Sequence, residues 1–282
     1  SSSKDLHSKL FIMKFSLLTV STLLPLLHAS PLPQDQYPVP THTPTAPQTP
    51  TQPNKRTAES LNQFLAVLLN EMPAIEGSID AVTGSLTELE GNVAALTKEP
   101  TTFNDLEDNL GNDCRDYTIV YARGTTEPGN VGILAGPPFF EAMDAVVGAR
   151  NVAIQGVNNY KADVVGYLAG GSKSGTVEMA RQISDARAKC PNTKLIASGY
   201  SQGGQLVHKA AALLPVDTAR WISKVVIFGD PLSRFPVANV DASRTKIFCN
   251  PGDNICDNGD LILPPHLTYG KDALAAALFA TS

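Results

Sequence analysis

The segment Gly199–Gly203 reads Gly-Tyr-Ser-Gln-Gly and places Ser201 between two glycines. The apolar run Leu195–Ala197 before it predicts a strand, and Gln205–Val207 after it suits the start of a helix. A strand, a sharp turn with a serine and a helix form a nucleophile elbow, in which the hydroxyl is exposed beside the helix N-terminus. Three fixed positions arise by chance in about one chain in ten of this length. Acyl transfer at Ser201 therefore needs support from a base, an acid and an oxyanion hole.

Two histidines are candidates for the base. His208 lies about two turns along the helix that follows Ser201, so we expect it on the helix surface and away from the elbow. His266 follows two prolines in a loop near the C-terminus, which fits the chain order serine, acid, histidine. We therefore predict His266 as the general base.

The acid that orients the histidine has two candidates, which both follow predicted strands. Asp230 precedes a proline and is expected to cap a turn. Asp253 lies between Cys249 and Cys256, and a disulfide across these cysteines would close a tight loop and hold the carboxylate in place. We therefore prefer Asp253.

An oxyanion hole needs two donors. The backbone N–H of Gln202, directly after the nucleophile, is one of them. The second is expected from a loop after an earlier strand, and Arg123–Thr126 follows the first predicted strand. We predict Thr125 as this donor, through its N–H and its hydroxyl.

Strands and helices alternate from about residue 113 onward. The predicted strands are 117–121, 152–155, 194–198, 224–228 and 246–248, with helices near 139–147, 176–188 and 205–214. Strands separated by helices imply right-handed crossovers and a parallel sheet, with functional loops at the carboxyl ends of the strands. We expect an α/β fold, a three-layer sandwich with a mainly parallel central sheet of about five strands.

Composition and the N-terminal segments indicate an exported protein. The chain has 282 residues, 43% of them hydrophobic, and its net charge of −5 gives no reason to expect a nucleic-acid partner. Residues 13–29 read as a signal peptide, with an apolar run that is short for a stable membrane span. Residues 1–12 precede Met13 and are interpreted as an artefact or an upstream extension. We expect a secreted, extracellular protein.

The four cysteines are meaningful in an exported protein. Cys114, Cys190, Cys249 and Cys256 form an even set, which predicts two disulfides with three connectivities open. Metal binding fits poorly because the chain has no CxxC pair. We expect no metal and no cofactor.

Two segments precede the α/β region. Residues 30–56 are rich in Pro and Thr and read as a linker or a propeptide, which ends at Lys55-Arg56, either a dibasic processing site or a solvated charge pair. In 57–98, apolar residues recur at intervals of four and three: Leu61, Leu65, Leu68, Met72, Ile75, Ile79, Val82, Leu86, Leu89, Val93 and Leu96.

This heptad-patterned extension is not a free coiled coil in our interpretation. Gly77, Gly84 and Gly91 interrupt it, at roughly 1 kcal/mol each relative to Ala, and Pro73 divides it. We favour helices that pack on the catalytic domain or on each other. Three roles stay open for 57–97: a lid or pro-region, self-association, and adhesion to wax or lipid surfaces.

Three separated motifs resemble those of the cutinases, fungal members above all. Pro191–Gly203 resembles their serine signature, and Tyr121–Asn130 resembles their oxyanion-loop segment. Cys249–Cys256 followed by Pro265–Leu267 resembles their acid and histidine segment. The likeness covers roughly 110–275, within a predicted catalytic domain of 105–282.

The resemblance implies a small α/β-hydrolase, a secreted and metal-free esterase that cleaves cutin polyester and short-to-medium acyl esters. It implies Ser201 as nucleophile, Asp253 as acid, His266 as base, and an oxyanion hole from Thr125 and Gln202. It also pairs Cys114 with Cys190 and Cys249 with Cys256, which contributes roughly 4–5 and 2–3 kcal/mol by a chain-entropy estimate. Near His266 we expect a substrate groove lined by Leu261, Leu263 and Leu267.

The chain departs from the family pattern in three places. Thr125 stands where members usually have serine, and Asp257–Asp260 is longer in polar residues, which reshapes one wall of the groove. An asparagine that braces the oxyanion loop is expected near Gly166–Leu168, where none stands. Two alternatives remain: an acetylxylan-type carbohydrate esterase, and a non-catalytic secreted surface-binding or elicitor protein.

Overall fold

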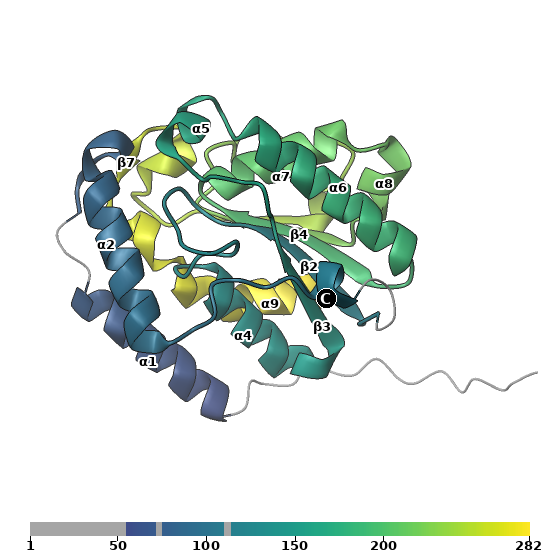
Figure 1. The fold of residues 1–282 in the computed structure, drawn as a ribbon, viewed down its shortest axis with the longest axis horizontal. Helices are drawn as coiled ribbons and strands as arrows, with labels where there is room; N and C mark the ends of the chain where they lie inside the picture. The colour runs from purple at the N-terminus through teal and green to yellow at the C-terminus, as the bar shows by residue number, and fades with distance from the viewer. Residues whose placement is uncertain (1–54, 72–74, 110–113) are drawn as a thin grey trace, which may run out of the picture. The chain divides into compact units, whose positions relative to one another are not determined.

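A five-stranded parallel sheet lies at the centre of the structure (Figure 1). The computed structural model describes residues 55–71, 75–109 and 114–282. The strands of the sheet run in the order β3-β2-β4-β5-β6, and every neighbouring pair is parallel. Their bounds are β2 Tyr117–Ala122, β3 Val152–Gly156, β4 Lys194–Tyr200, β5 Lys224–Phe228 and β6 Thr245–Phe248. The predicted fold class is confirmed.

The composition of the strands explains why the sheet is covered on both faces. All six residues of β2 are buried, and six of the seven in β4 are buried. Strands that read as continuous apolar runs are typical of parallel sheets with helices on both sides. β6, at one edge, is only partly buried, as expected where a strand has one neighbour.

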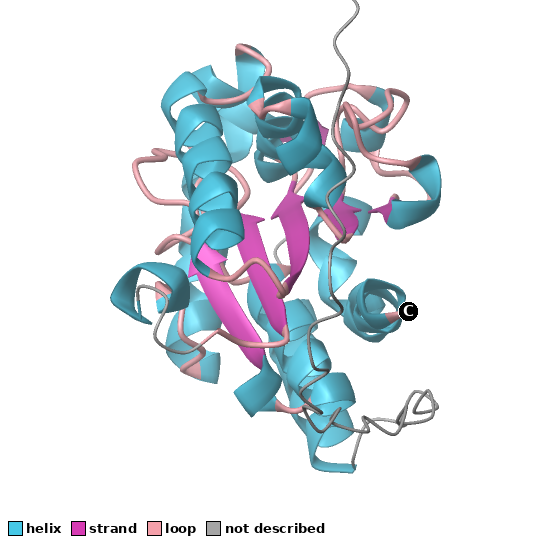
Figure 2. Cartoon of the chain, turned by 90° about the vertical axis from the view of Figure 1, so that its right-hand side faces the viewer, coloured by secondary structure: helices cyan, strands magenta, loops and turns pink. Residues whose placement is uncertain are grey.

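Helices cover the two faces of the sheet in separate groups (Figures 1 and 2). α4 (Gly136–Val147) and α9 (Ala273–Thr281) pack together on one face. α6 (Lys173–Lys189), α7 (Gln202–Leu213) and α8 (Val216–Trp221) cover the other. The shorter elements are α3 Asp105–Asn109, η1 Ala149–Asn151, α5 Val164–Leu168, η2 Ala242–Arg244, η3 Asn254–Asp257 and η4 Pro264–Asp272. This three-layer arrangement places the loops after β2, β4 and β6 at the same edge.

Two helices form the extension that precedes the α/β region. α1 (Lys55–Glu71) and α2 (Ile79–Thr97) pack on each other, and α1 also contacts α4 and η4. Their buried side chains belong to the same core cluster as β2 and α4: Phe64, Leu68, Ile75, Ile79, Leu86, Leu89 and Val93. Gly84 and Gly91 face open space, so the helix tolerates them away from the packed side. The predicted segments 1–12 and 13–29, most of 30–56, and Pro73 lie outside the described residues.

A second, two-stranded sheet joins the extension to the C-terminal loops. β1 (Gly77–Ser78) pairs antiparallel with β7 (Leu261–Ile262), and the N–H of Ile79 donates to the carbonyl of Asp260 at 2.7 Å. The sequence reading did not predict this sheet. β7 directly follows the polar segment Asp257–Asp260, where the chain departs from the family pattern, so the partner strand of the extension adjoins that departure.

Two disulfides cross-link the α/β region. Cys114 pairs with Cys190 across 76 residues, and Cys249 pairs with Cys256 across 7 residues. These are the pairings that the family resemblance implied. The second closes the loop between β6 and η3, in which Asp253 lies.

Within 55–71, 75–109 and 114–282, none of the helices has the length and apolar character that a membrane crossing requires.

Candidate active site

The turn between β4 and α7 holds Ser201 in a left-handed backbone conformation, with φ 54° and ψ −120°. Its N–H donates to the carbonyl of Phe228 on β5 at 2.9 Å, which ties the turn to the sheet. A Cβ at Gly199 would lie 2.5 Å from the backbone of Gly203, and one at Gly203 would lie 2.0 Å from the carbonyl oxygen of Ala122. Both glycines are therefore required by close backbone approach, as the predicted nucleophile elbow demands.

Ser201, His266 and Asp253 form one hydrogen-bonded series. Nε2 of His266 lies 3.0 Å from Oγ of Ser201, and Nδ1 lies 2.8 Å from Oδ2 of Asp253. All three side chains are buried. The serine follows β4, the aspartate follows β6 and the histidine lies in η4, so the sheet brings together residues far apart in sequence.

Asp253 is held as a carboxylate by several donors. Besides His266, the hydroxyl of Tyr269 donates to Oδ2 at 2.6 Å, and the N–H of Ile255 donates to Oδ1 at 3.0 Å. Burial acts to raise the pKa of Asp253, but the hydrogen bond and charge of His266 and these two donors outweigh it. The pKa of Asp253 therefore lies below its usual range.

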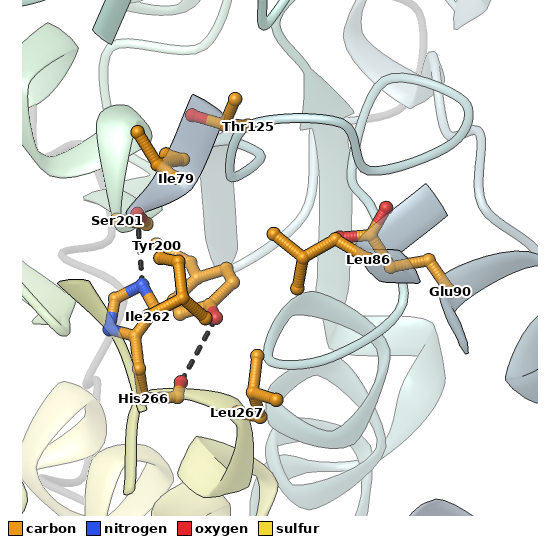
Figure 3. A pocket seen from close by; sticks show the side chains of 9 residues that line it. All are labelled: Ile79, Leu86, Glu90, Thr125, Tyr200, Ser201, Ile262, His266 and Leu267. Carbon is orange, nitrogen blue, oxygen red and sulfur yellow. Dashed lines mark hydrogen bonds between the residues drawn. The ribbon is translucent and has the colours of Figure 1, made fainter. Parts of the chain in front are cut away.

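The imidazole of His266 is fixed from a second side by Tyr200. The Tyr200 hydroxyl donates to the carbonyl oxygen of His266 at 2.9 Å, and the two rings stack with centroids 5.0 Å apart (Figure 3). Tyr200 is the residue before Ser201, so the elbow itself positions the histidine. Tyr200 and Tyr269 were not singled out from the sequence, since nothing in their spacing marks them.

The loop after β2 brings Thr125 beside Ser201. The Gln202 N–H is the first of α7 and has no acceptor within the helix. The buried carboxylate of Glu127 holds the loop: it accepts from the N–H groups of Gly124 at 2.7 Å, Ile133 at 2.9 Å and Leu134 at 2.8 Å. Burial raises the pKa of Glu127, while those three N–H groups and Arg123 oppose the shift. Glu127 is a loop-ordering residue that the sequence reading missed.

The space above Ser201 is small and covered by α2. Only 3% of Ser201 is exposed, and the cavity beside it has a volume of about 10 Å³, enough for about one water molecule. Figure 3 shows the residues that line it: Ile79, Leu86, Glu90, Thr125, Tyr200, Ser201, Ile262, His266 and Leu267. Three of these come from α2. The heptad spacing of Ile79 and Leu86 was the sequence signal that could have placed α2 here.

The predicted groove residues divide into two groups. Leu267 lines the cavity and is 1% exposed. Leu261 is 42% exposed, and neither Leu261 nor Leu263 is among the described residues that line the cavity. Ile262 lines the cavity instead, because side chains alternate along β7 and Leu261 therefore points away from it.

The expectation for His208 was wrong. The side chain is buried, and Nε2 lies 2.9 Å from Oδ2 of Asp230, which is fully buried. Asp230 also accepts from the N–H of Leu232 at 2.9 Å, so it does cap a turn as predicted. This pair packs behind the elbow at Gly204, where a Cβ would lie 2.9 Å from Oδ1 of Asp230. A helix surface that faces a buried loop cannot be recognised from helical spacing alone.

The arrangement is that of an α/β-hydrolase: a serine on a strand–turn–helix elbow, a histidine and an acid on later loops. A sequence profile of the Cutinase family matches residues 113–282. The chain belongs to the cutinase family and is a carboxylic ester hydrolase. Among the part of the chain that the structure describes, no group of residues suited to hold a metal ion occurs.

Curated relatives and a solved structure agree with this membership. A cutinase of Pyrenopeziza brassicae is 51% identical over 198 residues, which cover 67% of this chain and 97% of the relative. A cutinase of Hypocrea jecorina is 45% identical over 226 residues, 80% of this chain and 87% of the relative. The structure of Trichoderma reesei cutinase in complex with a C11Y4 phosphonate inhibitor is 43% identical, with a TM-score of 0.64, covering 79% of this chain and 99% of that one.

The coverage of the Hypocrea jecorina relative shows that the similarity includes part of the N-terminal helical extension. A match that covers 80% of this chain cannot lie within residues 113–282 alone, which the Cutinase profile matches, and must extend toward the N-terminus into the helical extension. The similarity to the Hypocrea jecorina relative therefore reaches α1 and α2. The sequence reading had set the heptad segment outside the usual family core.

We predict that Tyr269→Phe lowers the free energy of unfolding by about 1–3 kcal/mol at neutral pH, because Asp253 and the N–H of Asn250 each lose a partner. A lowered pKa of Asp253 stabilises the fold above the usual carboxyl pKa, and this contribution is lost as pH falls through the lowered value. The deficit of the variant should therefore shrink toward about pH 3. Urea unfolding of wild type and variant at neutral pH and at about pH 3 measures this deficit.

Tyr160→Phe is the matched control. Its hydroxyl is also buried, but it donates to the neutral carbonyl of Arg123 at 3.1 Å, so its deficit should be the same at both pH values. A pH-independent deficit in Tyr269→Phe would contradict the role assigned to the Asp253 charge.

Proposed function

We propose that this esterase cleaves cutin polyester and short-to-medium acyl esters through an acyl-enzyme on Ser201. The observation that carries the proposal is the continuous series from Asp253 through His266 to Ser201, with heavy-atom distances of 2.8 and 3.0 Å. The substrate class follows from the relatives, which are named cutinases. Apolar side chains in the cavity, such as Ile262 and Leu267, suit an acyl chain.

The mechanism uses these atoms in two half-reactions. Nε2 of His266 takes the proton of Ser201 as Oγ attacks the ester carbonyl carbon, and Asp253 stabilises the imidazolium that forms. The N–H groups of Gln202 and Thr125 bind the negative oxygen of the tetrahedral intermediate. His266 then gives its proton to the leaving alcohol. In the second half, it takes a proton from water as the water oxygen attacks the acyl carbon, and it returns that proton to Oγ of Ser201 as the bond between Oγ and the acyl carbon breaks and the acid leaves.

The described conformation is a closed one in this proposal, with α2 acting as a lid. A cavity of about 10 Å³ is too small for an ester, and Ile79, Leu86 and Glu90 of α2 line it. Substrate binding therefore requires α2 to move. A surface that offers apolar contacts to the face of α2 exposed by opening would favour the open state. Among the three roles open for 57–97, the lid has this support.

Secretion is part of the same proposal. Its support is the signal-like pattern of residues 13–29 and the two disulfides, which persist in oxidising compartments.

Ser201→Ala should abolish hydrolysis of p-nitrophenyl butyrate, with a loss of kcat of about 10³-fold or more and an unchanged thermal midpoint. The hydroxyl is the only group removed, and the residue keeps its place in the turn. Steady-state kinetics and circular dichroism of both proteins measure this. Wild-type protein should also release monomers from cutin.

Three results would overturn parts of this proposal. Retained butyrate hydrolysis in Ser201→Ala would remove the nucleophile assignment. Wild-type activity confined to acetyl esters would favour the acetylxylan-type alternative. A wild-type protein that is neither active on esters nor labelled by a fluorophosphonate would favour the non-catalytic alternative.

For the lid, Leu89→Ala should raise the rate of fluorophosphonate labelling by about tenfold or more. Leu89 is 2% exposed on α2 but does not line the cavity, so its truncation weakens the closed state without widening the site. Leu96→Ala on the same helix is the control, because Leu96 is 57% exposed and should change nothing. An unchanged labelling rate in Leu89→Ala, with the variant folded, would contradict a lid.

A further inference from the structure

A groove outside the catalytic cavity lies between α5, the start of α6 and the exposed side of α7. Its volume of about 720 Å³ falls within the roughly 300–1,000 Å³ that is usual for small-molecule sites. Among the described residues, none lines both this groove and the cavity at Ser201. The groove is therefore a separate candidate site.

Apolar side chains from three helices form the walls of this groove. Val165 of α5, Val177 of α6 and Leu213 of α7 line it, and they are 76%, 52% and 56% exposed. Single exposed apolar residues are common, but a groove lined by several of them from separate helices is typical of a binding surface. An alkyl chain in the groove would be removed from water together with these walls, and each buried methylene group should raise the affinity about threefold.

Two lysines give the rim of the groove a positive charge. Lys173 begins α6 and Lys209 lies on α7, and both side chains are exposed. Nζ of Lys209 donates to the carbonyl oxygen of Ala169 at 3.5 Å, which leaves the other two N–H groups of this ammonium. Within the part of the chain that the structure describes, neither lysine forms an ion pair. Both charges are therefore available to an anion.

One carboxylate also lines the groove, and it already has a partner. Asp163 caps the start of α5, where its Oδ1 accepts from the N–H of Gly166 at 2.7 Å. Two lysines against one aspartate leave one excess positive charge among the lining residues, on a chain whose net charge is −5. The groove therefore attracts an anion locally, although the chain as a whole is negative.

The groove adjoins the segment that contacts the nucleophile elbow. α5 lies between α2 and α7 and contacts both (Figure 1). The carbonyl oxygen of Asp163 accepts from the Gln202 side chain at 2.8 Å, and a Cβ at Gly166 would lie 2.7 Å from Oε1 of Gln202. Asp163 and Gly166 thus line the groove and also contact the residue after the nucleophile, which places the groove close to the reacting centre.

The proposed esterase reaction supplies a ligand of matching chemistry. Hydrolysis of an aliphatic ester releases a carboxylic acid, which is an anion at neutral pH because the usual carboxyl pKa is near 4. Its alkyl chain suits the three apolar walls, and its carboxylate suits the two lysines.

We propose that this groove is a binding site for a free aliphatic carboxylate, the class of acid that the esterase releases. The alkyl chain contacts Val165, Val177 and Leu213. The carboxylate lies at the rim, where Lys173 and Lys209 supply the opposite charge. The source of this ligand rests on the proposed function, but its binding needs no turnover at Ser201.

The test is a calorimetric titration of the full-length protein with decanoate below its critical micelle concentration, after Ser201 has been labelled with a fluorophosphonate. The label fills the catalytic cavity, so an acid that binds must lie elsewhere. We expect one decanoate per protein, and an affinity that rises about threefold per methylene group from hexanoate to decanoate. Two-dimensional NMR should show amide shift changes at Val165, Thr176, Val177 and Ala212, which line the groove.

The two lysines are tested by substitution. Lys173→Met and Lys209→Met should each weaken decanoate binding about 2- to 5-fold, and the double variant about 5- to 20-fold, because exposed ion pairs are individually weak. Added salt should weaken decanoate binding in wild type but not in the double variant. Lys246→Met is the matched control: it removes an exposed lysine on β6 that does not line the groove, and should leave the affinity unchanged.

The apolar wall is tested by Leu213→Ser, which should weaken decanoate binding about 3- to 10-fold because contact with the alkyl chain is lost. Leu69→Ser is the matched control. Leu69 is 58% exposed on α1, close to the value for Leu213, and it does not line the groove. Its substitution should leave the affinity unchanged.

Decan-1-ol separates a carboxylate site from a general apolar surface. It has the same chain without the charge, and should bind wild type at least about fivefold more weakly than decanoate does. Equal affinity for the alcohol and the acid, or undiminished decanoate binding in the double lysine variant, would indicate a face for neutral lipid and overturn the proposal. Absence of binding, or amide shift changes confined to other parts of the protein, would also overturn it.

Failure of the proposed function gives a different result. Wild-type protein would then not be labelled at Ser201 by the fluorophosphonate, and titration of the unlabelled protein would still decide whether the groove binds decanoate. Circular dichroism and thermal midpoints establish that each variant is folded, which is expected because every substituted side chain is exposed.

Discussion

The left-handed backbone of Ser201 is the constraint on which the rest of the site depends. A non-glycine residue at φ 54° is unfavourable, and it persists because the N–H of Ser201 is bonded to β5 and the flanking glycines let three backbone segments meet. The same turn sets Tyr200 against the ring of His266 and starts α7 at Gln202. One strained residue, over-determined by a parallel sheet, thus positions the Ser201 hydroxyl, the His266 ring and the first N–H of α7 together.

Buried polar side chains fix the positions of the loops around Ser201, which the sheet alone does not fix. Asp253 and Glu127 each accept three hydrogen bonds. The donors to Asp253 lie in η3 and η4, and the donors to Glu127 lie in the segment between β2 and α4. Each carboxylate replaces water as the partner of backbone N–H groups, so the loops on both sides of Ser201 are held without strands. Loss of one donor is costly because its partner stays buried.

Much of the fold and of the candidate site could be predicted from the sequence. The features that could not be predicted have one cause in common. Ser201, Asp253 and His266 are marked by motif and chain order, and the strands by apolar runs. His208 and Glu127 were misread or missed, because their burial depends on which loop packs over them. The β1–β7 pairing was missed because two-residue strands carry no periodicity, and Tyr269 because nothing local distinguishes a bridging tyrosine from a core one.

The N-terminal helical extension and the polar segment that departs from the family pattern are connected in the structure. The polar segment Asp257–Asp260 leads into β7, which pairs with β1 directly before α2 and lies four residues before His266. The lid proposed above would not move as a free helix, since displacement of α2 would pull on the loop that carries His266. In that proposal, access to Ser201 and the position of His266 are mechanically linked through β7.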